Sequence, residues 1–230
     1  MPNELLWLLM AVIDFCALLI VFRLFGREGL YAAIVISIIL CNIQVLKIVE
    51  IFGLTATLGN ILYGSIFLAT DLLSELYGKD KARKGVWIGF YALIFTSVIM
   101  QIALLFKPTA DDFIDPALRQ IFDFLPRVAI ASITAYMVSQ HHDIWLFHIL
   151  KNKFKGKHLW LRNNITTMIS QLIDSAIFCV IAFWGVFPHN IFIEILITTY
   201  IIKWVVAFID TPFIYLGKYI SVKYNLIKQD

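Results

Sequence analysis

Seven apolar stretches, each long enough to cross a bilayer as a helix, dominate this sequence of 230 residues. A helix needs about 20 mostly apolar residues to span the hydrocarbon core of a membrane. The stretches cover residues 5–22, 29–46, 54–76, 86–106, 128–149, 165–187 and 191–216. Since none of them alternates with a period of two residues, they favour helices over the strands of a barrel. The sequence therefore predicts an all-α, polytopic membrane protein.

Composition and motifs exclude several functional classes. Only 15% of the residues are charged and 60% are hydrophobic, which argues against a disordered chain, a nucleic-acid-binding module and a conventional soluble enzyme. Cys16, Cys41 and Cys179 lie in apolar runs without CxxC spacing, so they indicate core packing rather than disulfides or zinc. Neither a nucleophile motif nor a Walker A loop is present. We therefore expect a non-enzymatic protein without a metal or other cofactor.

The distribution of lysine and arginine predicts the orientation in the membrane. Most basic residues fall in the segments 23–28, 79–84, 151–162 and 218–228, which would all lie on one side. Loops on the cytoplasmic side carry such an excess. We therefore expect the amino terminus outside and a short basic tail, 218–230, in the cytoplasm. Because topology accounts for these basic loops, we expect no nucleic-acid partner.

Polar side chains inside the predicted spans indicate a pocket. Ionisable residues at membrane depth are costly and usually face a protein interior or a water-filled cavity. Asp174 and Lys203 lie in consecutive spans at similar depth, so they could form an ion pair. A polar pocket open to the outside and a structural ion pair between two helices both remain open. The candidate substrate-binding residues are Asn42, Asn60, Tyr63, Arg127, Tyr136, Gln171, Asp174 and Lys203.

A second polar group lies near the predicted inner end of the spans. Asp71 and Glu75 are four residues apart and would share a helix face. This group could form a gate or a proton relay, or it could be interfacial charge satisfied by water and loop lysines. Asp14, alone in the first span, is expected to bond a neighbouring helix. The candidate gating or proton-coupling residues are Asp71, Glu75, Asp143 and Asp210.

The longest predicted outer connection, residues 107–126, contains a short amphipathic pattern over 116–125. Asp115 followed by Pro116 resembles a helix N-cap with proline at the first helical position. We expect a short helix that lies on the outer leaflet or covers the outer mouth. An ordinary surface helix is the alternative.

Three ordered blocks resemble the queuosine precursor transporter family, also called the vitamin uptake transporters. The first block is NILYGSIFLATDLLSELYGKDKARKGVWIGFY, at residues 60–91, with the pairs Thr70-Asp71 and Tyr77-Gly78. The second is RVAIASITAYMVSQHHDIWLFHILK, at 127–151, and the third is LWLRNNITTMISQLIDSAIFCVIAFWG, at 159–185. The closing span with Lys203 also fits. The resemblance covers roughly residues 30–217.

The resemblance implies a transporter in the bacterial inner membrane. It would import 7-cyano-7-deazaguanine and related 7-deazaguanines for salvage into tRNA modification. It further implies a six-helix transporter core, residues 26–217, similar to the substrate-binding subunits of energy-coupling-factor transporters. Residues 1–25 would then form an additional amino-terminal transmembrane helix. Proton coupling, an energising ATPase complex as a partner, and facilitated diffusion all remain open.

Such a ligand suits the polar residues already identified. A guanine-like edge presents an N–H and an amino group side by side, which a carboxylate such as Asp174 accepts in bidentate fashion. Gln171, Asn60 or Lys203 could donate to the ring carbonyl. Stacking on the flat ring could come from Tyr63, Tyr136 or Trp204.

Two alternatives remain. The first is a carrier or substrate-binding subunit for another small vitamin or heterocycle, since a pocket for one flat ring could hold another. The second is a seven-helix receptor or photoreceptor, because Lys203 falls in the seventh span. The microbial retinal pattern requires an acid four residues earlier, where this chain has Thr199.

Overall fold

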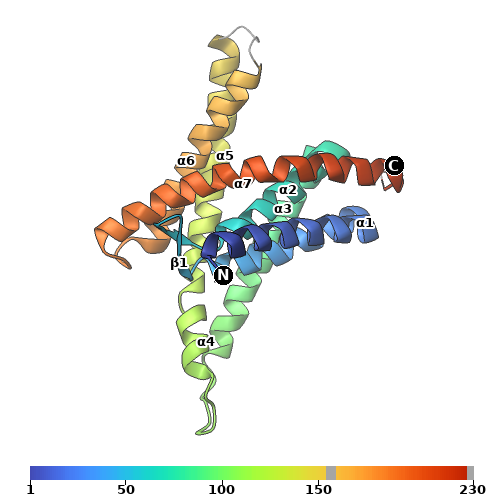
Figure 1. The fold of residues 1–230 in the computed structure, drawn as a ribbon. Coiled ribbons are helices and arrows are strands. Elements are labelled where there is room, and N and C mark those ends of the chain that lie inside the picture. The colour runs from blue at the N-terminus through green and yellow to red at the C-terminus, as the bar shows by residue number, and fades with distance from the viewer. Residues whose placement is uncertain (154–158, 227–230) are drawn as a thin grey trace.

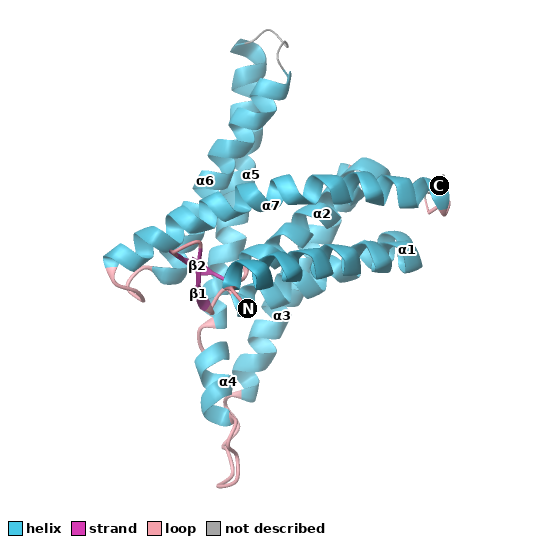
Figure 2. Ribbon diagram, viewed as in Figure 1, coloured by secondary structure: helices cyan, strands magenta, loops and turns pink. Residues whose placement is uncertain are grey.

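The computed structural model describes residues 1–153 and 159–226 and is mostly helical (Figures 1 and 2). This agrees with the predicted all-α membrane protein. A small antiparallel hairpin interrupts the helices near the amino-terminal third of the chain. The elements are α1 (Asn3–Gln44), β1 (Ile48–Ile51), β2 (Leu54–Thr57), α2 (Asn60–Tyr77), α3 (Lys79–Ala103), α4 (Asp115–Phe122), α5 (Leu125–Lys153), α6 (Leu159–Phe183) and α7 (His189–Lys223).

Helix α1 is folded back on itself at Gly26. This residue has φ 57° and ψ −133°, a conformation that a glycine adopts without a steric penalty. The two arms then approach so closely that a Cβ on Gly29 would lie 2.4 Å from the Val21 carbonyl oxygen. The arms, residues 3–25 and 27–44, run antiparallel (Figure 1). They cover the first predicted span and all but the last two residues of the second, and the predicted break between those spans is confirmed.

Four of the described helices are long and apolar enough to cross a membrane. They comprise α1, α3, the segment Asp115–Ser139, which runs from α4 into α5, and α7. A shorter apolar helix covers Met168–Phe183. Large apolar side chains are exposed on these helices, among them Tyr91 and Phe95 on α3. Because burying such surface in lipid is favourable, the chain is a multi-pass membrane protein.

The β-hairpin was not predicted, and it shortens the third predicted span. Residues 54–57, which we assigned to that span, form strand β2, and helix α2 begins only at Asn60. The strands pair from Ile48 with Thr57 to Ile51 with Leu54. Phe52 and Gly53 make the turn with positive φ angles of 53° and 73°. Two consecutive positive φ angles define the hairpin turn whose twist matches that of the flanking strands.

A short helix, α4, forms in the predicted outer connection, but its capping differs from our prediction. Asp115 is not the N-cap: it lies inside the helix, and its carboxylate pairs with Arg119 at 2.7 Å. The Asp112 carboxylate instead accepts hydrogen bonds from the backbone amides of Ile114, at 3.0 Å, and Asp115, at 3.2 Å. An acceptor a few residues before the helix satisfies these otherwise unpaired amides as well as an N-cap side chain does.

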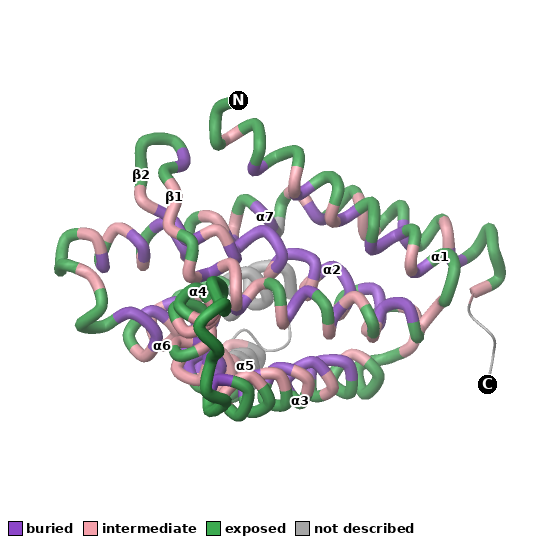
Figure 3. The backbone as a smooth tube through the Cα atoms, turned by 90° about the horizontal axis from the view of Figure 1, so that it is seen from below, coloured by how far each residue is buried: buried purple, intermediate pink, exposed green. Residues whose placement is uncertain are grey.

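The main apolar core joins α1, α2 and α7. Phe15 and Phe22 of the first arm of α1 are fully buried, as are Leu68 and Leu72 of α2, and Val206 of α7 belongs to the same cluster. Buried segments follow the sides of α1 and α2 that face each other (Figure 3). The first arm of α1 is thus packed into this core. Helices α5 and α6 form a separate long pair that α7 crosses (Figure 1), with a second apolar cluster where they meet.

Candidate functional site

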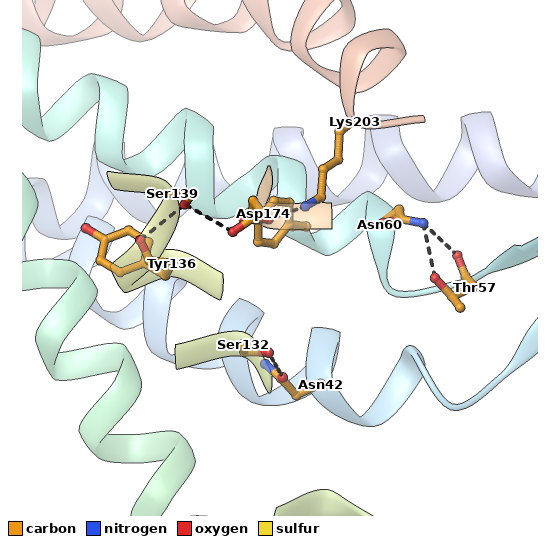
Figure 4. Close-up of polar contacts among 9 residues, drawn as sticks. Asn42, Thr57, Asn60, Ser132, Tyr136, Ser139, Asp174 and Lys203 are labelled. Carbon is orange, nitrogen blue, oxygen red and sulfur yellow. Dashed lines mark hydrogen bonds and ion pairs between the residues drawn. The ribbon is translucent and has the colours of Figure 1, made fainter. Parts of the chain in front are cut away.

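The centre of the candidate site is an ion pair between Asp174 of α6 and Lys203 of α7 (Figure 4). Both residues are buried, with exposed fractions of 6% and 8%. The pairing predicted from the depths of the two residues is therefore present. A buried charge is costly unless it is paired and hydrogen-bonded, so each group depends on the other. The pair forms where α7 crosses α6.

Three helices supply the partners of the Asp174 carboxylate. The hydroxyl of Tyr63 on α2 donates to Oδ2 at 3.2 Å, and the hydroxyl of Ser139 on α5 donates to Oδ1 at 3.4 Å. The Lys203 ammonium also lies 4.4 Å from the centre of the Tyr63 ring, a cation–π contact. Ser139 was missed in the sequence, although its spacing of three from Tyr136 places both on one helix face.

Asn42 and Asn60 are buried near this centre, but their hydrogen bonds go to other groups (Figure 4). The Asn42 amide donates to the Ile38 carbonyl at 2.7 Å, and its oxygen accepts from Ser132 at 2.5 Å. Asn60 donates to the Thr57 carbonyl at 3.1 Å and so joins strand β2 to helix α2. Both amides thus have local structural partners in this conformation.

Some polar atoms around the ion pair lack a partner within the described part of the chain. These buried atoms are the side-chain oxygens of Gln171 and Ser175 and the indole nitrogen of Trp204. Each lies within a few residues of Asp174 or Lys203 on the same helix. Tyr136 packs its ring edge-on against Phe90, at 5.1 Å between centroids. A buried polar atom without a protein partner is costly, so such atoms are available to a ligand.

The structure places Arg127 apart from this centre. Its guanidinium donates to the carbonyls of Ile181, at 2.7 Å, and Trp184, at 2.6 Å. These are unpaired carbonyls at the carboxyl end of α6, which a cation satisfies well. Ile181 is seven residues from Asp174, or roughly 10 Å along a helix. In this conformation Arg127 caps α6 and does not contact the ion pair.

The inner group of acids gathers partly at one cleft of about 380 Å³ between α2 and α7. Glu75 pairs with Lys218 at 2.6 Å, and Asp71 is exposed to the cleft. Asp210 is buried on α7, close enough to Asp71 for the two carboxylates to interact electrostatically. The side chain of Asp143, the fourth candidate, lies outside the described residues. The cleft is lined by Asp71, Ser74, Glu75, Thr211, Ile214, Tyr215 and Lys218.

Asp14 accepts a hydrogen bond from the Ser65 hydroxyl of α2. This confirms the prediction that it bonds a neighbouring helix. Within the part of the chain that the structure describes, no three histidine, cysteine, aspartate or glutamate side chains gather as they would around a metal ion.

Comparison with known proteins identifies one family. A family model described as "Putative vitamin uptake transporter" matches residues 57–217. A "Probable queuosine precursor transporter" of Bacillus subtilis (strain 168) is 44% identical over 219 residues, which is 95% of this chain and 96% of that protein. The "Queuosine precursor transporter" of Escherichia coli (strain K12) is 27% identical over 164 residues, 70% of this chain and 72% of that protein. No solved structure matches the chain significantly.

Proposed function

The chain belongs to the vitamin uptake transporter family, and from that premise we propose that it imports 7-deazaguanine precursors of queuosine. The observation that carries the proposal is the likeness to the Bacillus subtilis queuosine precursor transporter, which extends over nearly the whole of both chains. The Escherichia coli relative, which is less similar to this chain, is also named as a queuosine precursor transporter. We name 7-cyano-7-deazaguanine as the first substrate to test.

The chemistry around Asp174 supports such a ligand. A guanine-like edge offers two adjacent donors, an N–H and an amino group, and a neighbouring carbonyl acceptor. The Asp174 carboxylate would accept from the two donors, and the Lys203 ammonium would donate to the carbonyl. Tyr63 and Ser139 hold the carboxylate from two further helices. The ligand would thereby lie between Asp174 and Lys203 and form hydrogen bonds with both charged groups.

This arrangement would also provide selectivity. A ring that lacks either the donor pair or the carbonyl would separate Asp174 from Lys203 without replacing their hydrogen bonds. Leaving such buried charges unpaired carries a large penalty, so the site would reject that ring strongly. Gln171 and Trp204 hold further unpartnered atoms close by in the sequence, which could bind the ring substituents.

We propose the following arrangement in the bacterial inner membrane. Residues 26–217 form a six-helix transporter core similar to the substrate-binding subunits of energy-coupling-factor transporters, and residues 1–25 add one helix. The family match to residues 57–217 covers most of this proposed core and ends at the same residue. The amino terminus lies outside and the tail 218–230 in the cytoplasm, in keeping with the basic loops. Asp71, Glu75, Asp143 and Asp210 then belong to the inner end as gating or proton-coupling residues, and an ATPase partner is the alternative energy source.

Equilibrium binding tests the proposal directly. We expect 7-cyano-7-deazaguanine to bind the purified protein in detergent with micromolar or tighter affinity in calorimetry, while riboflavin, which lacks the donor pair, binds more weakly. Guanine, which shares the whole edge, shows how much of the affinity comes from that edge. Uptake of the same compound by proteoliposomes is the second measurement. If folded protein bound riboflavin in preference, or bound none of the three, the deazaguanine assignment would be wrong and another heterocycle would become the better candidate.

A further inference from the structure

Helix α7 lies beside α2 and the strand that precedes it, and the two segments run in the same direction (Figure 1). Three polar contacts join them in order along their length. The middle one is the buried centre, where Lys203 of α7 lies over the ring of Tyr63 of α2. The other two contacts lie at opposite ends and belong to neither the ion pair nor its ligands.

The first end contact ties the hairpin to α7. The Glu194 carboxylate accepts a hydrogen bond from the backbone amide of Thr55 at 3.0 Å, and the Thr198 hydroxyl lies 2.8 Å from the Thr55 carbonyl oxygen. Two side chains of one helix face thus contact both backbone groups of one residue on the free edge of β2, although the Thr198 hydroxyl also lies 2.8 Å from the Glu194 carbonyl oxygen. An unpaired strand edge is otherwise exposed to water or to another chain.

The second end contact closes the other end of the same two helices. The Lys218 ammonium of α7 pairs with the Glu75 carboxylate of α2 at 2.6 Å. About half of each side chain is exposed, 45% for Lys218 and 55% for Glu75. Tyr77, at the end of α2, donates to the Leu226 carbonyl just beyond α7 at 3.1 Å. Exposed ion pairs contribute little to stability, so this contact can open at low cost.

Between the two ends, the helices are held together by close apolar packing. Gly64 of α2 lies against Val206 of α7, and Gly217 of α7 lies against Leu72 of α2. Small residues at such positions let helix backbones approach closely within a membrane. The two helices are therefore in close contact at these points, and the cleft lined by Asp71 and Thr211 lies between them. Each end adds a few polar groups that water can replace.

We propose that these two end contacts are the gates of the transporter. The hairpin gate is Glu194 and Thr198 on Thr55, and the tail gate is Lys218 on Glu75. Both are closed in this structure, so the Asp174–Lys203 centre is occluded from both sides. Separation of the two helices at one end, with the contact at the other end still closed, would admit ligand to the centre from that side alone. The inference rests on the proposed transport function and identifies the parts that move.

Two native cysteines report on access to the centre. Cys41 and Cys179 both lie close enough to the Lys203 ammonium to interact with it electrostatically. Cys179 is buried and Cys41 is partly buried, whereas Cys16 is exposed. In a Cys16→Ser background, the rate at which a membrane-impermeant maleimide labels the protein therefore measures how often the centre is open.

The experiment compares gate variants in right-side-out and inside-out vesicles without substrate. Glu194→Ala combined with Thr198→Val opens the hairpin gate, and Glu75→Gln opens the tail gate. We expect each to raise the labelling rate about fivefold, from one side only, and from opposite sides. Lys218→Gln should reproduce the effect of Glu75→Gln. Glu28→Gln is the matched control, because it removes an exposed ion pair whose two members, Arg27 and Glu28, are neighbours in α1.

Labelling that rose from the same side in both gate variants, or rose in neither although each eluted as folded protein, would overturn the proposal. Uptake of 7-cyano-7-deazaguanine is measured separately on the same vesicles. Wild-type protein that failed to transport it would contradict the proposed substrate, while opposite-sided labelling would still support the two gates. The two inferences therefore fail in distinguishable ways.

Discussion

Gly64 of α2 touches Val206 of α7 so closely that a Cβ at position 64 would lie 2.1 Å from the valine Cγ1. Position 64 directly follows Tyr63, whose hydroxyl contacts Asp174. The packing that brings α2 against α7 therefore also sets the height at which Tyr63 meets the ion pair. A change in the distance between the backbones of α2 and α7 would therefore also move the Tyr63 hydroxyl relative to Asp174.

Gly64→Ala should destabilise the protein by about 1–3 kcal/mol, because a methyl group must be forced into a closely packed contact. We expect a lower melting temperature in detergent and weaker ligand binding, since Tyr63 shifts with α2. The double variant Gly64→Ala/Val206→Ala removes the clashing methyl groups and should recover most of the loss. A single variant as stable as the wild type would show that the helices separate without cost.

Asp174→Asn should weaken 7-cyano-7-deazaguanine binding by about 10- to 100-fold, because hydrogen bonds to a charged acceptor contribute about 1.5–3 kcal/mol. An amide of the same shape keeps the volume but can no longer accept from both ligand donors. Calorimetry on the purified variant measures the change. Near-normal affinity in a well-folded variant would contradict the role of the carboxylate.

The variant Asp174→Asn also leaves the Lys203 ammonium buried without its counter-charge, which is destabilising in itself. The double variant Asp174→Asn/Lys203→Met separates the two effects. We expect it to recover thermal stability relative to the single variant while ligand binding remains at least as weak as in that variant. If the double variant bound the ligand again, stability rather than recognition would explain the single variant.

Arg127→Met should lower the melting temperature but leave the ligand affinity within about twofold. The reason is that Arg127 donates to the Ile181 and Trp184 carbonyls at the end of α6, and removing it exposes those acceptors at a cost of about 1–3 kcal/mol. Calorimetry and thermal unfolding on one preparation give both values. A large drop in ligand affinity without a change in thermal stability would show instead that Arg127 binds the ligand.

Hydropathy and charge were sufficient to predict the membrane character, the break between the first two spans and the Asp174–Lys203 pair. The pair could be predicted because an uncompensated charge at membrane depth requires a partner, and few candidates existed. The same argument predicted that Asp14 bonds a neighbouring helix, and its carboxylate accepts a hydrogen bond from Ser65 of α2. These predictions depend on the identity and depth of single residues, so they can be made without knowing how the helices pack.

The features that the sequence did not reveal depend on packing. Hydropathy could not separate strand β2 from the start of α2, because Leu54 and Ala56 are apolar in either structure. Ser139 carries no signal of its own, since its role appears only when α5 brings it to Asp174. Arg127 lies at a depth that would suit a binding pocket, but its guanidinium donates to carbonyls at the end of α6. Each of these outcomes is decided by neighbours distant in sequence.

The hairpin turn offers a last test, because Phe52 is a bulky residue in the left-handed region, with φ 53°. Asn followed by Gly is the preferred pair for this turn, so Phe52→Asn should stabilise the hairpin by about 1 kcal/mol. The Phe52 side chain is 74% exposed and loses little packing when it is replaced. We expect roughly fivefold slower hydrogen exchange of the hairpin amides.

The matched variant for the hairpin is Gly53→Ala. A Cβ on Gly53 meets no atom within 4 Å, so only the backbone conformation, with φ +73°, opposes the substitution. We expect faster exchange of the same amides, by a similar factor, because alanine disfavours positive φ. Equal exchange rates in Phe52→Asn, Gly53→Ala and wild type would mean that Glu194 and Thr198, rather than the turn, hold the hairpin in place.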